Sequence, residues 1–347
     1  MNLNKKILAL DEFINQALYN PKDGYYMKSN PFGKNGDFIT SPNISILFSE
    51  MVSIWCISFW QNLKCPKKIN LIELGSGNGQ MIYDMINSFK KFPKFHKSCN
   101  FIILEKSPYL KKIQKKKLKN FNVKWIKNLN EIKKGKNIFI ANEFFDALPI
   151  KQFFKINNKW MERFIKLDKN NNKAFMNMDS SIKKLEKKIG FKISNKQKTI
   201  EYSPLALEYL KNISKKITDK KGALLIIDYG YLEDLMKDTL MAIRKHTVSN
   251  LFKEFKNSDI TYKLNFKLLE KITKILKLKC QGITTQRNFL INLGIQQRAE
   301  IISRNLPFSK KADIYYRLKR LIDKNQMGDL FKVMIITGKK INFKVGF

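Results

Sequence analysis

The sequence predicts an α/β fold, in which a mostly parallel sheet carries helices on both faces. From residue 69 onward, short apolar runs alternate with helical patterns, which is typical of successive strand–helix units. The first run ends in closely spaced glycines, as the tight turn between a parallel strand and its helix requires. Residues 1–68 lack this alternation. We therefore expect an N-terminal helical extension, residues 1–68, and one large domain, residues 69–347.

The N-terminal extension shows two helical patterns. Apolar residues recur at helical spacing over residues 7–18, and the pattern stops at Asn20-Pro21. A polar loop with glycines occupies residues 31–42. Apolar residues then recur every three or four positions over residues 44–59, after Ser41-Pro42, which suits the start of a helix.

Five short apolar runs predict parallel strands, at residues 69–74, 101–104, 123–126, 137–141 and 223–227. Helical patterns at residues 81–92 and 109–118 separate the first three. Roughly 80 residues lie between the fourth and fifth strands, far more than an ordinary connection needs, so we expect an inserted α+β segment at about residues 151–222. In it we predict a hairpin over 153–168, turning at Asn157-Asn158, and a helix over 180–188. Helices over 289–305 and 311–324 and a strand over 331–337 complete the domain.

The charge of the chain is extreme but has a simple origin. Lys and Arg number 67 against 29 Asp and Glu, which gives +38 and is compatible with a nucleic-acid partner. However, 60 of these residues are Lys and 7 are Arg, the residue whose bidentate fork reads bases. Lys, Asn, Ile and Phe have A/T-rich codons, so a biased genome would produce the same composition. We expect no specific nucleic-acid partner.

Composition also excludes several classes of protein. Hydrophobic residues make up 44% of the chain, which is enough for a core. No apolar run approaches the roughly 20 residues that span a bilayer, so we expect no membrane insertion. The opening residues lack the features of signal and transit peptides. Four scattered cysteines and two histidines predict neither disulfides nor a metal site, and indicate a reducing compartment.

A glycine-rich turn is the sharpest local signal. Glu73 precedes Gly75, Gly77 and Gly79, between the first predicted strand and its helix. The spacing is GxGxG and position 80 is Gln, so the GxGxxG fingerprint of dinucleotide-binding proteins is not met. An acidic residue followed by GxGxG instead resembles the first motif of class I S-adenosylmethionine-dependent methyltransferases. A tight turn without a ligand is the alternative.

Further polar residues follow the second and third predicted strands. Glu105 ends the second strand at the edge that carries the glycine turn, where a carboxylate can accept hydrogen bonds from both ribose hydroxyls. Alternatively, it pairs with Lys106 at the surface. Trp125 and Asn128 fall at the end of the third strand, where an adenine would be flanked. Trp125 alternates with Val123, so it could equally be a core residue.

Asn142, Glu143 and Asp146 directly follow the fourth predicted strand. Ligands of open α/β sheets bind in the crevice at the carboxyl ends of the strands. Two carboxylates three residues apart, beside two aromatics and Pro149, are unusual at such an end. Helix capping could explain Asp146, but it does not so easily explain Glu143. We therefore place these residues in the candidate site.

Taken together, the motifs resemble one family over about residues 10–339. It is the class I methyltransferase family that includes the mitochondrial complex I assembly factor acting as a protein-arginine methyltransferase, with its bacterial relatives. The most distinctive match is Ala141-Asn142-Glu143-Phe144-Phe145-Asp146-Ala147-Leu148-Pro149. The other matches are Asn15 to Pro21 with Gly24-Tyr25-Tyr26, Gly36-Asp37-Phe38-Ile39-Thr40-Ser41-Pro42, Glu201 to Pro204, Asp228 to Tyr231, Asp238-Thr239-Leu240, Arg244 with His246, Phe289 to Arg298, and Met327 to Val333.

The resemblance implies a Rossmann-like fold and S-adenosyl-L-methionine as the cofactor. Its cofactor-binding residues would be Glu73, Gly75, Gly77, Gly79, Glu105, Trp125, Asn128 and Asn142, with Asp37 and Thr40 on a loop that covers the cofactor. It implies an arginine of a partner protein as the substrate, possibly in a respiratory NADH dehydrogenase subunit. Glu143 would hold the guanidinium, with Asp146 as the second catalytic residue. The location would be bacterial cytoplasm or, in a eukaryote, the mitochondrial matrix.

Some positions depart from the family pattern. Ser76 and Asn78 stand in the glycine turn where relatives often have Pro and Arg, a change that keeps the backbone geometry. Ser249-Asn250-Leu251 replaces a usual Asp-Pro-Leu, and a frequent His is missing after Thr261. These last two changes concern the substrate contacts. A nucleic-acid methyltransferase and a non-catalytic assembly factor that keeps the fold remain the alternative functions.

Overall fold

The central sheet of the computed structural model is mostly parallel, as predicted. The structure describes residues 7–33, 36–37, 39–133, 135–168, 172–218 and 221–347, so Phe38 of the covering-loop motif lies outside the described residues. The strand order is β15-β16-β10-β5-β2-β3-β4, with β14 beside β10. The strands are β2 (Ile69–Leu74), β3 (Cys99–Leu104), β4 (Val123–Ile126), β5 (Lys136–Asn142), β10 (Gly222–Tyr231), β14 (Leu264–Asn265), β15 (Leu278–Thr285) and β16 (Phe331–Gly338).

The order of the strands places a crevice at the centre of this sheet. The chain runs from β2 outward through β3 to β4, and then returns to the other side of β2 as β5. The connections after β2 and β5 therefore diverge to opposite sides, and they leave an opening at the carboxyl ends of these strands. β16 runs antiparallel to both β10 and β15.

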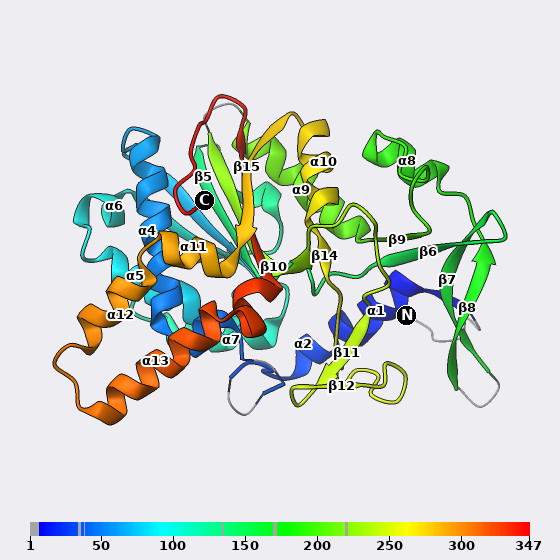
Figure 1. The fold of residues 1–347 in the computed structure, drawn as a ribbon, viewed down its shortest axis with the longest axis horizontal. Coiled ribbons are helices and arrows are strands. Elements are labelled where there is room, and N and C mark those ends of the chain that lie inside the picture. Colours follow the sequence, from blue (N-terminus) through cyan, green and yellow to red (C-terminus); the bar gives the residue numbers. More distant parts are fainter. Residues whose placement is uncertain (1–6, 34–35, 38, 134, 169–171, 219–220) are drawn as a thin grey trace.

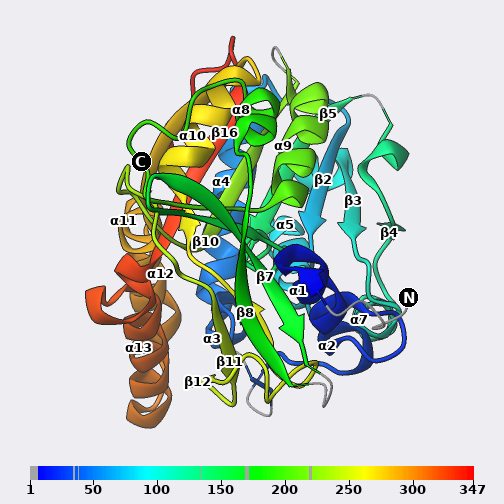
Figure 2. The same ribbon diagram turned by 90° about the vertical axis from the view of Figure 1, so that its right-hand side faces the viewer.

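Helices cover both faces of the sheet (Figures 1 and 2), and its central strands contribute side chains to the cores on both faces. In β5, Ile138 and Ile140 join the core under α4 (Ile46–Asn62) and α5 (Gln80–Phe89), whereas Phe139 and Ala141 join the core under α9 (Pro204–Ile217) and α10 (Phe266–Ile275). Because both faces are buried, a strand of this sheet is a continuous apolar run rather than an alternating one. This burial explains why the strands were predictable from short apolar runs.

The N-terminus differs from the prediction of one helix over residues 7–18. Residues Ile7–Ala9 form strand β1, which pairs antiparallel with β7 (Lys159–Leu167), and helix α1 begins only at Leu10 and ends at Tyr19. Helical spacing of the apolar residues could not reveal this, because the strand partner lies about 150 residues away. Short helices α2 (Tyr25–Lys28) and α3 (Ser41–Ile44) follow, and α4 begins after Ser45, whose hydroxyl accepts the Leu47 N–H.

The segment between β5 and β10 forms an antiparallel sheet of its own. β6 (Lys151–Ile156) and β7 are the predicted hairpin, and Asn157 and Asn158 make its turn with φ of 46° and 61°. This left-handed pair matches the right-handed twist of a hairpin. The sheet order is β1-β7-β6-β9, with β8 on β7, so the N-terminal strand shares a sheet with the insertion. The remaining elements are β8 (Lys173–Asp179), α8 (Lys183–Ile189) and β9 (Thr199–Tyr202).

The C-terminal part adds helices and a small sheet. Gly294, at φ of 87°, divides the helix predicted over 289–305 into α11 (Gln286–Asn292) and α12 (Ile295–Ser303). The sequence did not predict the sheet β12-β11-β13, formed by β11 (Met241–Arg244), β12 (Thr247–Ser249) and β13 (Asp259–Thr261). The other helices are α6 (Pro93–Ser98), α7 (Pro108–Lys117) and α13 (Phe308–Ile322). In the described part of the chain, no helix has the length and apolar character needed to cross a bilayer.

Candidate functional site

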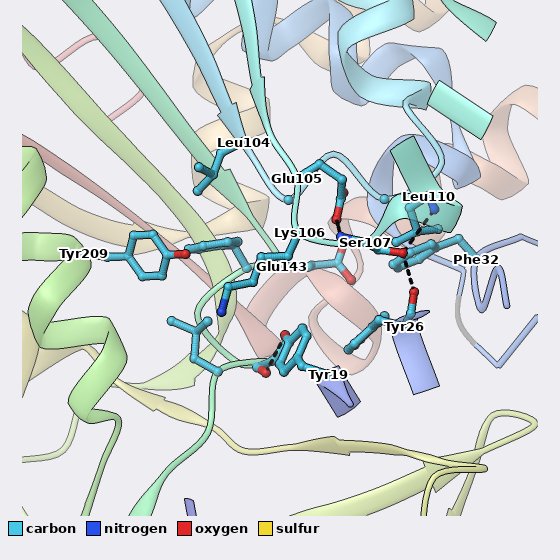
Figure 3. Close-up of a pocket in the computed structure, with 15 residues that line it drawn as sticks. Tyr19, Tyr26, Phe32, Leu104, Glu105, Lys106, Ser107, Leu110, Glu143 and Tyr209 are labelled. Atoms are coloured by element: carbon cyan, nitrogen blue, oxygen red, sulfur yellow. Dashed lines mark hydrogen bonds between the residues drawn. The ribbon is translucent and has the colours of Figure 1, made fainter. Parts of the chain in front are cut away.

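A cavity of about 650 Å³ opens at the carboxyl ends of β2, β3 and β5 (Figure 3). Its floor is the glycine turn after β2, and Glu105 and Glu143 enter it from the ends of β3 and β5. Tyr19 and Tyr26 come from the N-terminal segment and Tyr209 from α9, so aromatic rings close the other sides. The cavity therefore lies at the strand edge that the sequence predicted.

A second, more polar pocket of about 350 Å³ continues from this cavity. The two share Phe32, Gly75, Gly77 and Glu143 in their walls. Polar side chains line the rest of the second pocket, including Thr40, Glu73 and Asn142 together with Asn43, Ser76, Asn78 and Gln80. The joined space is thus elongated, with an aromatic end near Glu105 and a polar end beyond the glycine turn. An elongated ligand with one aromatic and one charged end would fit it.

The glycine turn can be built only from glycine at its key positions. Gly75, Gly77 and Gly79 have φ of 65°, 53° and 78°, in the left-handed region that other residues rarely adopt. A Cβ on Gly75 would lie 2.8 Å from a Phe144 ring carbon, and one on Gly77 would lie 3.2 Å from the Phe32 ring. The turn therefore presents bare backbone to the cavity.

Glu73 supports this turn from below. Its Oε2 accepts a hydrogen bond of 2.6 Å from the Ser76 hydroxyl, which holds the turn against the end of β2. Burial raises the pKa of the Glu73 carboxyl to about 7, and the Ser76 hydrogen bond opposes that rise. Glu73 also lines the polar pocket, so its carboxylate can meet a ligand there.

Hydrogen-bond donors hold both carboxylate oxygens of Glu105. The Ser107 N–H donates to its Oε1 at 2.8 Å, and the Gln114 amide donates to its Oε2 at 2.8 Å. Burial raises the pKa of Glu105 above its usual value, and these two hydrogen bonds lower it. Lys106, the alternative partner, instead lies with its ammonium group 5.5 Å from the centre of the Tyr19 ring. Glu105 therefore faces the cavity with oxygen lone pairs to spare.

Glu143 lies where the cavity and the polar pocket meet. Its φ is 49°, a strained value for a residue with a side chain, and such strain collects at functional sites. Its Oε1 accepts from the Ser41 N–H at 3.1 Å and from the Asn142 amide at 3.2 Å. Burial raises the pKa of the Glu143 carboxyl to about 7. Among the described residues, the buried Oδ1 of Asn142 has no hydrogen-bond partner, so it can accept one from a ligand.

Asp146 does not line either pocket. Its Oδ2 accepts from the Thr261 hydroxyl at 3.3 Å, and burial, together with the nearby Glu143 charge, raises its pKa to about 7. Asp228, a fully buried residue at the end of β10, accepts from the Phe145 N–H at 2.9 Å and thereby holds this loop. The sequence placed Asp146 beside a substrate, whereas in the structure it is close enough to Glu143 to interact with its charge but lines neither pocket.

Asp259 adds another buried carboxyl to this region. It accepts a 2.7 Å hydrogen bond from the Tyr26 hydroxyl, and burial and the charge of Asp146 raise its pKa to about 7. Sequence reasoning missed Asp259, because it lies on β13, more than 100 residues from Asp146. Despite these carboxyls, no group of three or more potential ligand side chains among the described residues is arranged to hold a metal ion.

Trp125 and Asn128 are not brought to the cavity, contrary to the expectation that they flank an adenine. The Trp125 indole N–H donates to Gln114 Oε1 at 2.9 Å, and its ring packs against the core. Asn128 is exposed and caps a single helical turn, where its Oδ1 accepts the Asn130 N–H. Capping by Asn is a local preference and needs no ligand.

The two residues predicted on the covering loop have different positions. Thr40 lines the polar pocket, in line with a cofactor contact. Asp37 does not line either pocket. Its Oδ2 accepts from the Tyr25 hydroxyl at 2.6 Å and its Oδ1 from the Lys245 N–H at 2.7 Å, so it ties the N-terminal segment to the β11–β12 hairpin. Its position therefore indicates a structural role for Asp37.

Two other family motifs also have structural roles. Glu201 accepts from the Gln152 amide at 2.5 Å and from the Thr239 N–H at 3.1 Å, and Asp238 pairs with Arg163 at 2.9 Å. These bonds join the inserted sheet to the segment that follows β10. Neither Glu201 nor Asp238 lines the cavity or the polar pocket.

Comparison with known proteins points to one chemistry. The model of a family described as S-adenosyl-L-methionine-dependent methyltransferase matches residues 51–284. The chain is 29% identical to the mitochondrial protein arginine methyltransferase NDUFAF7 of Xenopus laevis, over 94% of this chain and 80% of that protein. It is 28% identical to the Drosophila melanogaster homolog, over 96% of this chain and 83% of that protein.

A solved structure has the same fold. A protein from Burkholderia thailandensis, bound to S-adenosyl-homocysteine, superposes with a TM-score of 0.82 at 21% identity. The likeness covers 98% of this chain and 90% of that one. It confirms the predicted fold class, including the mostly parallel sheet.

Proposed function

The chain belongs to this family of S-adenosyl-L-methionine-dependent methyltransferases, and on that premise we propose that it methylates an arginine side chain of a partner protein. The observation that supports the arginine assignment is Glu143, a half-buried carboxylate in the wall of the cavity. The relatives named above are protein arginine methyltransferases, which supports the same assignment.

The residues of the elongated site fit the cofactor. The bare glycine turn gives space for close approach, Glu105 can accept from the ribose hydroxyls, and the polar pocket can receive the charged amino-acid end. The unpaired Asn142 Oδ1 can accept from an ammonium group there. When bound, the cofactor supplies an electrophilic methyl group on a sulfonium. We propose Glu73, Gly75, Gly77, Gly79, Glu105, Asn142 and Thr40 as its binding residues.

The residues of the protein must hold an arginine nitrogen of the substrate in line with that methyl group. Good alignment of two reactants can contribute about 7–11 kcal/mol to a rate. A guanidinium is charged at neutral pH, and a carboxylate can bind two of its N–H groups in a fork and fix the third nitrogen. We assign this role to Glu143. Each transfer forms the bond from the attacked nitrogen to the methyl carbon and breaks the bond from that carbon to sulfur. Because Glu143 holds the other two nitrogens, the proton that the attacked nitrogen loses passes to solvent.

Asp146 would act through Glu143, because it lines neither pocket and its charge raises the negative potential at Glu143. We assign contact with the substrate protein to the insertion at residues 151–222, since a small-molecule methyltransferase would not need this extra surface. The mitochondrial relatives lead us to propose a respiratory NADH dehydrogenase subunit as the substrate protein. A radiolabelled methyl transfer assay on lysate, followed by mass spectrometry, tests the assignment. Label found only on lysine, nucleic acid or small molecules would contradict it.

The pH profile of catalysis provides a second test. Because the folded pKa of Glu143 is raised to about 7, its charged fraction falls tenfold for each pH unit below that value. We expect kcat/KM for an arginine peptide to rise with pH up to about 7 and then to level off, because the free enzyme must be ionised to hold the cation. Rates measured from pH 5.5 to 9 should show this limb, and E143Q should lack it. A flat wild-type profile would remove Glu143 as the titrating group.

Nucleic-acid methylation is the rival that the charge favours. A wide groove lined by Lys68, Lys90, Lys97, Lys124, Lys133 and Lys136 lies around the amino ends of β2, β3, β4 and β5. That is the sheet edge opposite the cavity, so a nucleic-acid strand bound in the groove would not reach the methyl group of a cofactor in the cavity. We expect only non-specific binding, with affinity that falls steeply between roughly 50 and 200 mM salt. Salt-tolerant, sequence-selective binding in a filter assay would favour the rival.

A non-catalytic assembly factor that keeps the fold is the other alternative. It would bind the partner protein without transferring methyl groups. The presence of Glu105 and of the glycine turn argues against this alternative, because a protein under no catalytic constraint can lose these residues. The labelling assay described above decides between the two.

A further inference from the structure

Gln114 is a buried amide at a position where packing alone would favour an apolar residue. Helix α7 turns only two residues into the core, Leu110 and Gln114, which are one helical turn apart. The side chain of Gln114 is completely buried. A buried amide costs free energy unless it is hydrogen-bonded, so its partners indicate why it is there.

The amide of Gln114 connects three parts of the cofactor region. Its Nε2 donates to Glu105 Oε2 and to the Gly77 carbonyl, both at 2.8 Å, and its Oε1 accepts from the Trp125 indole N–H at 2.9 Å. Both N–H groups face acceptors, and the oxygen faces a donor. The opposite orientation would set oxygen against two oxygens, so only this one is chemically consistent.

From this geometry we propose that Gln114 is a positioning residue. It aligns the Glu105 carboxylate with the glycine turn, so that the carboxylate and the turn can both contact the ribose of the cofactor. The inference rests on the cofactor site proposed above. Gln114 donates to Glu105 Oε2 and the Ser107 N–H donates to Oε1, which fixes the orientation of the carboxylate, and its remaining acceptor capacity is available to the ribose hydroxyls.

The same contact explains the third glycine of the turn. A Cβ on Gly79 would lie 3.3 Å from Gln114 Cγ, tighter than an ordinary contact. The turn must approach α7 this closely for the Gly77 carbonyl to reach the amide. Trp125, for which the sequence left an adenine contact and a core position open, completes the hydrogen bonding of Gln114.

Q114M tests the proposal, because Met has a similar length and fills the space without hydrogen-bonding. Two ligands are titrated by calorimetry: S-adenosylhomocysteine and its analogue that lacks both ribose hydroxyls. We expect Q114M to weaken S-adenosylhomocysteine binding roughly 10- to 100-fold, as loss of a hydrogen bond to a charged group implies. Binding of the analogue should change less than about twofold. The KM for S-adenosylmethionine should rise, with kcat nearly unchanged at saturation.

Two further variants serve as references. E105Q should show the same dependence on the ribose hydroxyls as Q114M, because both act on the same contact. W125F removes only the third partner of the amide, and should weaken cofactor binding less than Q114M does.

The outcomes separate the two claims. A wild-type protein that does not bind S-adenosylhomocysteine would overturn the proposed cofactor site, and the role of Gln114 with it. If wild type binds and E105Q discriminates between the ligands, but Q114M binds both like wild type, Gln114 has no positioning role. If Q114M weakened the binding of both ligands equally, the proposal would also be overturned, because the effect would not depend on the contact between Glu105 and the ribose hydroxyls.

Discussion

Replacement of Glu143 by Gln is expected to lower turnover about a hundredfold and to leave cofactor affinity nearly unchanged. A hundredfold loss corresponds to about 2.7 kcal/mol in the barrier. Gln has the length of Glu, and its Oε1 can still accept from Ser41 and Asn142. What disappears is the charge that would hold a guanidinium in a buried setting, where such pairs are strong. Steady-state kinetics with an arginine peptide and calorimetric titration of the cofactor measure the two effects.

E201Q is a suitable control for E143Q. Glu201 is a buried carboxyl whose pKa, like that of Glu143, is raised by burial to about 7, but it lies outside the cavity. Because it accepts from Gln152 and Thr239, its replacement should lower the melting temperature. Turnover per folded molecule should stay near the wild-type value. If E143Q keeps full protein-methylating activity, Glu143 is not part of the mechanism.

Replacement of Gly77 by Val is expected to abolish detectable cofactor binding. Val at φ of 53° is strained, and its side chain would extend from a Cβ already 3.2 Å from the Phe32 ring, inside the space the cofactor needs. The strain itself is of order 1–3 kcal/mol, within the stability of an ordinary domain, so the variant should still fold. Calorimetry with S-adenosylhomocysteine measures the binding, and circular dichroism the fold.

Gly190 offers a matched control for this strain. It ends α8 with φ of 79°, and a Cβ there would lie 3.3 Å from an Ile275 side chain, so G190V is strained to a similar degree. It does not line the cavity or the polar pocket. We expect G190V to lose stability but to bind the cofactor like wild type. Equal binding by G77V and wild type would contradict the glycine-turn assignment.

The parts of the site that the sequence predicted follow from local rules. The glycine turn, Glu105 and Glu143 each come directly after a buried strand, and the carboxyl ends of parallel strands meet at one edge. Recognising the strands was therefore enough to bring these residues together. The hairpin at Asn157-Asn158 was equally local, because two residues set its geometry.

The parts that the sequence did not predict depend on distant segments. Tyr26 reaches Asp259 from more than 200 residues away, and nothing in the local pattern of β13 marks it as part of a site. Gln114 stands in a lysine-rich helix, and nothing in the local pattern of that helix marks it as part of a site. The predicted strand gave the position of Trp125, but its hydrogen-bond partner Gln114 depends on how α7 packs on the sheet. Residues Ile7–Ala9 form strand β1 because they pair with the distant strand β7, which their local sequence does not indicate.

The place of β16 in the sheet constrains how the protein is made in the cell. This strand lies between β10 and β15, although both precede it in the chain. Strand β16 begins roughly 100 residues after β10 ends. Because translation adds about 5–20 residues per second, β16 is synthesised about 5–20 s after β10. During that time β10 has an unpaired apolar edge, and such edges recruit strands from other molecules. A nascent chain is therefore expected to need chaperone protection until residue 338 has left the ribosome.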